Sequence, residues 1–193
     1  MNSCHLKSTY MLKNSKTSYG WVSIVIHWLM AVGIIFMFGL GLYMVELTYY
    51  DAWYKGSLDL HKSLGVLLIG FLIFRLFWRA ATIQPTALAA PKWQQIAAHG
   101  MHHLLYLGMI LVLISGYLIS TADGHAIVVF EGVNLPALPW HIANQEDIAG
   151  EIHNFLAWTL IILSTFHALA ALKHHFINKD RTLIRMLKTD NSN

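Results

Sequence analysis

The stretch Trp21–Tyr43, WVSIVIHWLMAVGIIFMFGLGLY, decides the fold class because its 23 residues include no Asp, Glu, Lys or Arg. A helix needs about 20 mostly apolar residues to cross a bilayer. Comparable apolar runs predict two more spans at 100–121 and 152–174. A fourth span at 58–78 has charged residues near its ends, where long basic side chains can reach the interface.

The sequence therefore predicts an all-α integral membrane four-helix bundle. It forms one membrane domain over residues 1–193, with tails at 1–20 and 179–193 and connections at 79–99 and 123–150. Composition agrees, since 56% of the residues are hydrophobic and only 12% are charged, about half the charged fraction of a soluble domain. Three long uncharged runs argue against the alternative of a very apolar soluble bundle. The single cysteine, Cys4, excludes a disulfide framework and a thiolate cluster.

The charged residues predict the orientation in the membrane. Eleven basic residues fall on the side of the tails and the 79–99 connection, whereas Lys55 and Lys62 fall on the other side with eight of the ten acids. By the positive-inside rule, both termini are expected to be cytoplasmic. The net charge of +3 then reports topology, and a nucleic-acid partner is not expected. The eleven basic residues are Lys7, Lys13, Lys16, Arg75, Arg79, Lys92, Lys173, Lys179, Arg181, Arg185 and Lys188.

Four of the twelve histidines fall inside the spans, where an unsatisfied polar group is costly and therefore marks a candidate site. His27 and His167 are expected at similar depth in the cytoplasmic half, and His61 and His153 at similar depth in the outer half. His153 and His167 are 14 residues apart, a rise of about 21 Å that leaves both near one helix face. The sequence thus predicts two pairs, His27 with His167 and His61 with His153.

Two neutral imidazoles facing each other across a bundle suit a haem iron with two axial protein ligands. Zinc fits less well because it prefers four close ligands, and no acids lie at these depths. The alternative for any one histidine is a hydrogen bond to a neighbouring helix. Five more histidines are expected at the cytoplasmic interface and three in solvent. The interfacial set, which could bond haem propionates together with Arg75, Arg79 and Lys173, is His99, His102, His103, His174 and His175; the solvated set is His5, His125 and His141.

At this point the sequence resembles the bacterial cytochrome b561 family, small four-helix membrane proteins with two b-type haems. The resemblance runs from Tyr19 to about Met186 and is most distinctive near the C-terminus. It is carried by Ile26-His27-Trp28-Leu29, His61 with Gly65, Arg75-Leu76-Phe77-Trp78-Arg79, His99-Gly100-Met101-His102 with Tyr106, His153, His167, Lys173-His174-His175-Phe176, Lys179-Asp180 and Thr182-Leu183-Ile184-Arg185-Met186. The resemblance implies that His27, His61, His153 and His167 are the haem ligands.

The implied function is electron transfer between a donor at the outer face and membrane quinone, ubiquinone or menaquinone, because a haem with two axial ligands has no open position for oxygen. Some family members oxidise superoxide and reduce ubiquinone. The acidic outer loops would repel superoxide, leaving Lys55 and Lys62 as the expected access point. One alternative is a cytochrome b subunit of a hydrogenase or formate dehydrogenase, and another is a histidine-rich proton or metal transporter.

Overall fold

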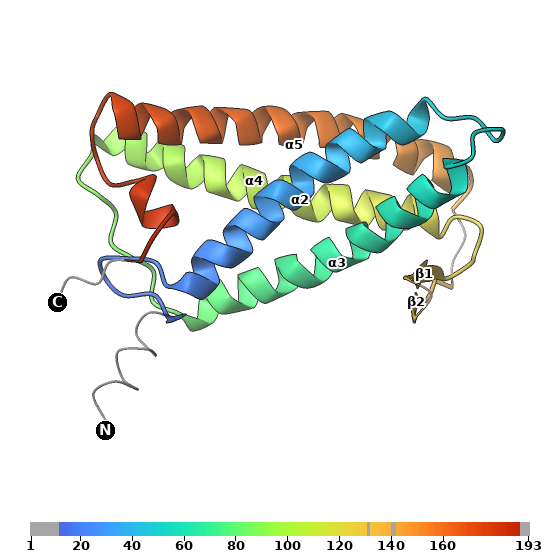
Figure 1. Cartoon of the computed structure of the whole chain (residues 1–193), viewed down its shortest axis with the longest axis horizontal. Coiled ribbons are helices and arrows are strands. Elements are labelled where there is room, and N and C mark those ends of the chain that lie inside the picture. Colours follow the sequence, from blue (N-terminus) through green and yellow to red (C-terminus); the bar gives the residue numbers. More distant parts are fainter. Residues whose placement is uncertain (1–11, 131, 140–141, 190–193) are drawn as a thin grey trace, which may run out of the picture. The chain divides into compact units, whose positions relative to one another are not determined.

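The computed structural model describes residues 12–130, 132–139 and 142–189. Its long helices are α2 (Trp21–Val45), α3 (Tyr54–Ala81), α4 (Lys92–Ser120) and α5 (Gln145–Phe176), as Figure 1 shows. Each is long and apolar enough to cross a membrane, which confirms the predicted membrane four-helix bundle. Several residues named above lie outside the described part of the chain: Cys4, His5, Lys7 and His141.

The helices are longer than the apolar spans predicted from the sequence. α4 begins at Lys92 directly after Pro91, so the last eight residues of the expected 79–99 connection are helical. Proline suits this position because the first turn of a helix leaves its N–H groups unbonded. α5 begins at Gln145 with Glu146 and Asp147 in its first turn, where carboxylates favour the helix dipole. A run of apolar residues identifies the part of a helix that lies in the hydrocarbon layer of the membrane, but it does not include polar turns at the helix ends.

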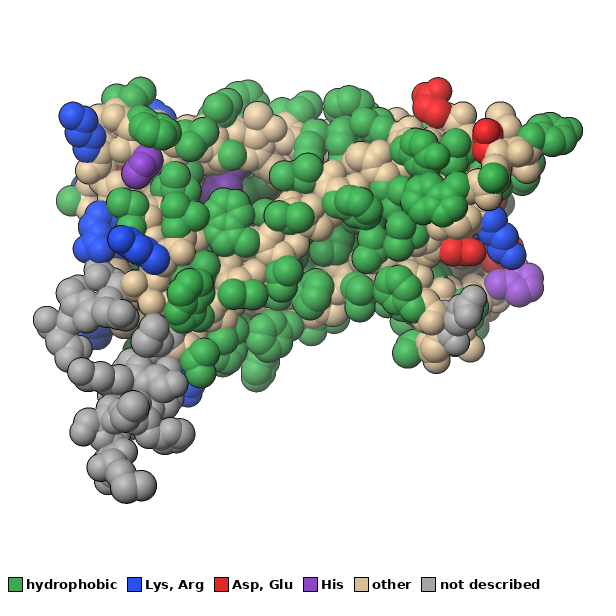
Figure 2. Space-filling view, in the orientation of Figure 1, with side chains coloured by type: hydrophobic (Ala, Val, Ile, Leu, Met, Phe, Trp, Pro, Cys, Tyr) green, Lys and Arg blue, Asp and Glu red, His purple; other side chains and the backbone are tan. Residues whose placement is uncertain are grey.

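The surface of the helices is strongly apolar, as expected for a protein solvated by lipid. Many large apolar side chains on the spans are exposed, among them Val32, Ile35, Ile73 and Phe77, each more than 60% exposed. Apolar side chains cover most of the helical surface seen in Figure 2. In water, exposed apolar surface on this scale would promote association. The exposed residues are therefore the lipid-facing side of the bundle.

The chain divides into two compact units, and each long helix contributes to both. Unit 1 comprises residues 1–31, 71–101 and 164–193, and unit 2 comprises residues 32–70 and 102–163. The two predicted histidine pairs separate between them, because His27 and His167 belong to unit 1 while His61 and His153 belong to unit 2. The two units are described separately below.

In unit 1 the segment before α2 is fixed to the start of α2 and to the end of α3 by side-chain hydrogen bonds. Asn14 Oδ1 accepts from the Gly20 N–H at 2.9 Å and from Ser23 Oγ at 2.7 Å. Asn14 Nδ2 donates to Thr82 Oγ1, just past α3, at 3.2 Å. Gly20 has no room for a side chain, because a Cβ there would lie 2.3 Å from the Leu12 carbonyl oxygen. The loop that carries Lys13 and Lys16 is thereby held against α2.

The C-terminal segment of unit 1 contacts the same region. η1 (Ile184–Met186) is a short 3-10 helix, and its Met186 carbonyl accepts a 2.6 Å hydrogen bond from Trp28 Nε1. Arg185 donates to the Thr86 carbonyl at 2.9 Å, and Thr86 in turn donates from its N–H to the Lys16 carbonyl at 2.9 Å. The N-terminal loop, the α3–α4 connection and the C-terminal segment are therefore linked by hydrogen bonds.

In unit 2 the connection at 123–150 contains a small antiparallel hairpin that the sequence analysis did not predict. β1 (Ile127–Val129) pairs with β2 (Val133–Leu135), with Val129 opposite Val133. Ile127 and Val129 are buried, so these two apolar side chains of β1 pack inward on one face of the strand. The Phe130 N–H donates to Ser63 Oγ at 3.2 Å, and Ser63 itself is buried. This bond ties the hairpin to α3 two residues after His61.

Candidate haem-binding site

The imidazoles of His27 and His167 face each other within unit 1. His27 lies on α2 and His167 on α5, both half-buried. Their ring centroids are 6.3 Å apart and the ring planes are inclined at 68°. The structure thus brings together His27 and His167, which lie near opposite ends of the chain and were predicted to lie at similar depth in the membrane.

The imidazoles of His61 and His153 form the matching pair within unit 2. His61 lies on α3 and His153 on α5, again half-buried. Their centroids are also 6.3 Å apart, and the planes are inclined at 72°. The two pairs use different helices for one member, α2 in unit 1 and α3 in unit 2, yet they have the same internal geometry.

Hydrogen bonding at Nδ1 sets the tautomer of His153. Nδ1 lies 3.0 Å from the Val112 carbonyl oxygen and 3.1 Å from Ser115 Oγ. The carbonyl can only accept, and the Ser115 hydroxyl already donates to that same oxygen at 2.9 Å. The Nδ1 atom of His153 therefore carries the proton, which leaves the Nε2 lone pair available to bind a metal. This is the usual arrangement of a metal-binding histidine.

Glycines allow two helices to approach the imidazoles of unit 2. A Cβ at Gly116 on α4 would lie 3.1 Å from Cε1 of His153, closer than side chains normally pack. A Cβ at Gly41 on α2 would lie 3.5 Å from Cε1 of His61. Gly65, which follows His61 by one turn, would instead meet Met37 at 3.8 Å. Gly65 is recognisable from the sequence by its spacing from His61, whereas Gly41, Gly116 and Ser115 are identified only once the neighbouring helices are known.

The surroundings of His27 are cationic. Arg75 donates from Nη2 to His27 Nδ1 at 3.0 Å and from Nη1 to the Met30 sulfur at 3.9 Å. Trp28 packs edge-on against the His27 ring with centroids 5.4 Å apart. Arg79, named together with Arg75 from the sequence, donates instead to Gln84 Oε1 at 3.3 Å. Among the described residues, Arg75 therefore contacts a histidine side chain, whereas the side-chain bond of Arg79 goes to a glutamine.

The remaining predicted histidines have other environments. His174 Nδ1 lies 2.5 Å from Asp180 Oδ2. His125 is exposed in the 123–150 connection, and its Nδ1 lies 3.1 Å from Asp123 Oδ2. His175 packs against Phe176 with ring centroids 4.8 Å apart. His99, His102 and His103 lie on α4. Within the described residues, no three His, Cys, Asp or Glu side chains converge on one point, so a compact zinc-type ligand set is not formed there.

Three carboxylates outside the spans have lowered pKa values, and two of them, Asp180 and Asp123, lie close to a histidine. For Asp180, burial would raise the pKa, but hydrogen bonds from Thr182 and His174 outweigh this and lower it below the usual range. For Asp123, the backbone N–H of His125 is the main cause of a lowered pKa. Each carboxylate fixes a turn next to a helix end, one in each unit.

Residues 18–189 match the model of the prokaryotic cytochrome b561 family, which covers every helix described above. The chain belongs to this family. It is 46% identical to Cytochrome b561 homolog 2 of Escherichia coli (strain K12) over 180 residues, 93% of this chain and 96% of that protein. It is also 28% identical over 175 residues to a protein of Yersinia pestis named Probable superoxide oxidase CybB, covering 88% of this chain and 95% of that protein.

A further relative, Cytochrome b561 homolog 1 of Escherichia coli (strain K12), is 28% identical over 130 residues, 67% of this chain and 73% of that protein. Membership of the cytochrome b561 family makes this chain a membrane cytochrome that binds b-type haem and transfers electrons. Its four membrane-spanning helices place it as a multi-pass protein of the bacterial inner membrane. The resemblance stated from sequence motifs is thereby confirmed at the level of the family.

Proposed function

We propose that this cytochrome holds two b-type haems and carries electrons between a donor at the outer face and the membrane quinone pool, ubiquinone or menaquinone. His27 and His167 are the axial ligands of one haem, and His61 and His153 those of the other. The observation that carries the proposal is the separation of the imidazoles in each pair.

The separation fits two imidazoles on opposite sides of one iron. An imidazole nitrogen binds a first-row metal at about 2 Å, so the ring centres of two such ligands are about 6 Å apart. Both pairs measure 6.3 Å. Two imidazoles that merely stack or share a hydrogen bond have no reason to reproduce this distance twice. The Nδ1 bond from His153 to Val112 gives independent support, because it leaves Nε2 free to act as a ligand.

The residues around each pair would bind and orient the haem. A haem with two imidazole ligands passes one electron at a time and leaves no iron position for dioxygen. Val112 and Ser115 hold the His153 ring in one orientation, and Gly116 allows α4 to lie against that ring. Arg75 supplies a positive charge beside His27 that suits a haem propionate. A propionate contact for Arg79 stays a prediction from the sequence.

We propose superoxide as the electron donor, on the basis of the name of one relative and of the positions of two lysines. The Yersinia pestis protein is named a probable superoxide oxidase. In this reaction two superoxide anions each lose one electron to give dioxygen, and one quinone takes two electrons and two protons. Lys55 and Lys62 are the only basic residues of unit 2, and we assign them to the access point for the anion. This assignment assumes that both termini are cytoplasmic, as the charge distribution predicts.

The donor assignment is tested by stopped-flow reduction of the haem-loaded protein with superoxide. Reduction near the diffusion limit that slows several-fold in K62Q, with K92Q unchanged, would support superoxide as substrate. Slow reduction at a rate that is the same in the wild type and in K62Q would exclude superoxide as the donor. It would leave the haem assignment untouched.

The haem assignment is tested by haem content and optical spectra of the purified protein. The wild type is expected to contain two haems per chain, and His27→Ala and His61→Ala to lose one each. His125→Ala is the matched control, because that side chain is 84% exposed in the 123–150 connection. Retention of two bis-histidine haems after His27→Ala would refute the pairing. A colourless protein would favour a transporter instead.

One observation favours a second candidate, a cytochrome b subunit of a larger oxidoreductase. The hairpin of unit 2 exposes the apolar side chains of Val128, Phe130 and Val133, each more than half exposed. Such a patch suits a docked partner protein. Co-purification of a large metalloenzyme from cells at native expression, lost in Phe130→Ser, would support this candidate. A lone protein with quinone reactivity would count against it.

A further inference from the structure

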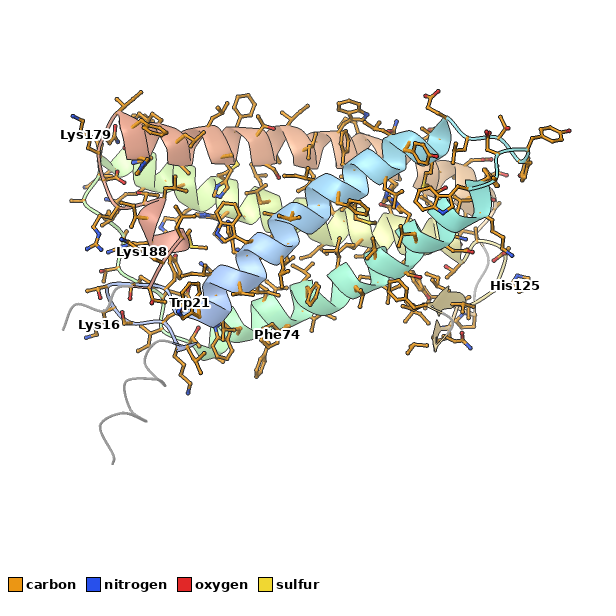
Figure 3. All side chains as sticks on the ribbon, in the orientation of Figure 1. Lys16, Trp21, Phe74, His125, Lys179 and Lys188 are labelled. Atoms are coloured by element: carbon orange, nitrogen blue, oxygen red, sulfur yellow. The ribbon has the colours of Figure 1, made fainter. Side chains whose placement is uncertain are left out.

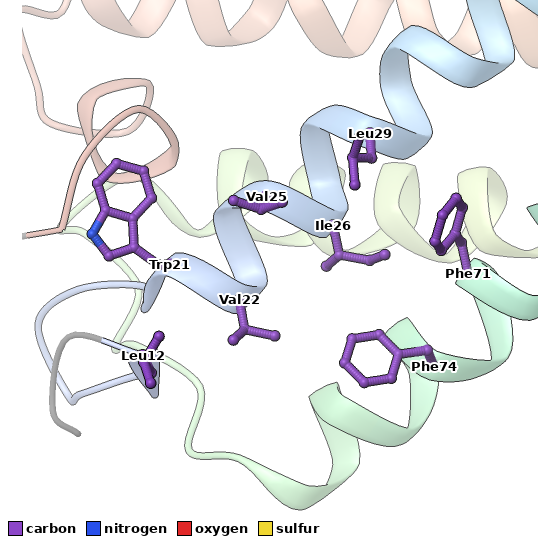
Figure 4. Close-up of a pocket in the computed structure, with 8 residues that line it drawn as sticks. All are labelled: Leu12, Trp21, Val22, Val25, Ile26, Leu29, Phe71 and Phe74. Carbon is purple, nitrogen blue, oxygen red and sulfur yellow. The ribbon is translucent and has the colours of Figure 1, made fainter. Parts of the chain in front are cut away.

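An apolar groove of about 540 Å³ lies on the surface of unit 1, between α2 and α3. This is within the range of pockets that bind small molecules, about 300–1,000 Å³. In Figure 4, Leu12 and Trp21 lie at one end of the groove and Phe71 and Phe74 at the other. The complete lining is Leu12, Trp21, Val22, Val25, Ile26, Leu29, Phe71 and Phe74. Its only polar side-chain atom is the indole nitrogen of Trp21.

The end of the groove at Trp21 adjoins an anchored basic loop. Leu12 in the lining is followed by Lys13, and Gly20, which precedes Trp21, packs directly on the Lys13 backbone. Lys13 and Lys16 are exposed. In the view of Figure 3, Lys16 lies beyond Trp21 on the side away from Phe74.

The positive charge near this loop is not neutralised by acids. Asp180 is the only acidic residue among the described residues of unit 1, and it is paired with His174 at 2.5 Å. Arg185 adds a further cation nearby, because its guanidinium donates to Thr86, which itself bonds the Lys16 carbonyl. The groove therefore has an apolar body and a cationic end.

We propose that this groove binds one anionic glycerophospholipid. An acyl chain lies along Val22, Val25 and Phe74, and the phosphate group is bound by Lys13 and Lys16. Trp21 lies between these two parts, where interfacial indoles normally lie. The Asn14 hydrogen bonds and the close packing of Gly20 hold the lysines at this position before any lipid binds. The proposal depends on the membrane fold and is independent of how the haems are held.

The lining argues for an acyl chain over a quinone head group. A quinone ring needs hydrogen-bond donors for its two carbonyl oxygens, and the groove offers only the Trp21 indole. An uncharged quinone could accept hydrogen bonds from Lys13 or Lys16, but it carries no charge to balance their two positive charges. An anionic phospholipid, in contrast, uses both the apolar body and the cationic end of the groove.

The test is native mass spectrometry of the haem-loaded full-length protein in detergent, titrated with phosphatidylglycerol or with phosphatidylcholine of identical acyl chains. The wild type is expected to keep one phosphatidylglycerol preferentially. Each lysine near an anionic head group contributes about fivefold, so K13Q/K16Q should weaken this binding about 25-fold. The matched control K92Q/K179Q removes the same charge from other parts of unit 1 and should change binding by less than about threefold.

Two further measurements locate the acyl chain. Val25→Trp fills the groove and should reduce binding of both lipids while the haem spectrum is unchanged. Phosphatidylglycerol with brominated chains should quench more fluorescence in the wild type than in Trp21→Phe. Equal retention of the two lipids would overturn the proposal, as would equal effects of the two double variants. Displacement of phosphatidylglycerol by ubiquinone, or a groove covered by a second copy in a stable dimer, would also overturn it.

Discussion

The two histidine pairs have the same internal geometry and opposite surroundings. Both have ring centroids 6.3 Å apart. In unit 2, His153 Nδ1 donates to a backbone carbonyl, whereas in unit 1, His27 Nδ1 accepts from the Arg75 guanidinium. Among the described residues, unit 1 has ten basic residues and one acid, while unit 2 has two basic residues and seven acids.

This difference separates the contacts that position each proposed haem ligand from the contacts that would set the reduction potential of its haem. Helix packing alone gives the two pairs their common spacing. The Nδ1 partner sets the electron donation of the ring, since a carbonyl partner makes imidazole a stronger donor and favours the oxidised metal. In unit 1, metal binding through Nε2 of His27 requires the ring proton on Nδ1, so the hydrogen bond from Arg75 must be released when the metal binds. The guanidinium then remains nearby as a cation, which favours the reduced form. We therefore expect the unit 1 site to have the higher reduction potential, so that electrons move favourably from unit 2 to unit 1.

Removing one histidine from each pair gives the largest expected effect and tests whether the two pairs form separate sites. His153→Ala should abolish the lower-potential haem and His167→Ala the higher-potential one, because neither pair shares a ligand with the other. Redox titration followed in the haem α-band measures this. Loss of both haems in either variant would mean that the two sites do not form independently. The different surroundings of the two pairs could then not give two separate potentials.

A smaller but still site-selective effect is expected at Gly116. Its Cβ would lie 3.1 Å from His153, so Gly116→Leu should displace the ring and weaken haem binding in unit 2 by about 1–3 kcal/mol. Gly39→Leu in the same unit is the control, since nothing lies within 4 Å of a Cβ there. Haem retention during gel filtration and the redox titration give the readout. Equal loss in the two variants would contradict the close approach of α4.

The sequence predicted the spans and the histidine pairs for reasons that are local to each helix. Hydrophobic length identifies a span, and a helix rise of about 1.5 Å per residue converts position into depth. The partners of the rings were not predictable in this way. Gly116, Ser115 and Val112 act on His153 from another helix, and only the rotation of α4 about its axis brings them there.

The hairpin and the longer helix ends escaped prediction for a related reason. Ile127 to Val129 is too short to show a period, and its strand is defined by pairing with Val133 to Leu135. The polar turns at 92–99 and 145–151 continue helices whose apolar part ends earlier. Composition distinguishes residues in the hydrocarbon layer from residues in water, but it does not show at which residue the hydrogen-bonded helix ends.

Changing Arg75 sharpens the electrostatic side of the comparison. Arg75→Leu should lower the potential of the unit 1 haem by on the order of 50–100 mV, because a unit charge this close contributes about 2 kcal/mol at an effective dielectric near 20. Arg75→Lys should restore part of the shift. The unit 2 potential serves as the internal control in the same titration. A shift of equal size at both haems, or none, would show that the Arg75 charge does not distinguish the sites.

The smallest effect is expected from the carboxylates that fix one turn in each unit. The pKa of Asp180 is lowered in the folded protein, so its ionised form stabilises the fold above the ordinary Asp pKa of about 3.9, and this stabilisation is lost as the pH falls through the folded value. Asp180→Asn should therefore lower the melting temperature at pH 7 by a few degrees and hardly at all below pH 3. Asp123, whose side chain is 67% exposed, should give a still smaller change when replaced by Asn. Melting curves of both variants across this pH range measure the difference. A larger loss for Asp123→Asn would mean that the 123–150 connection, rather than the C-terminal segment linked to Trp28, limits the stability of the bundle.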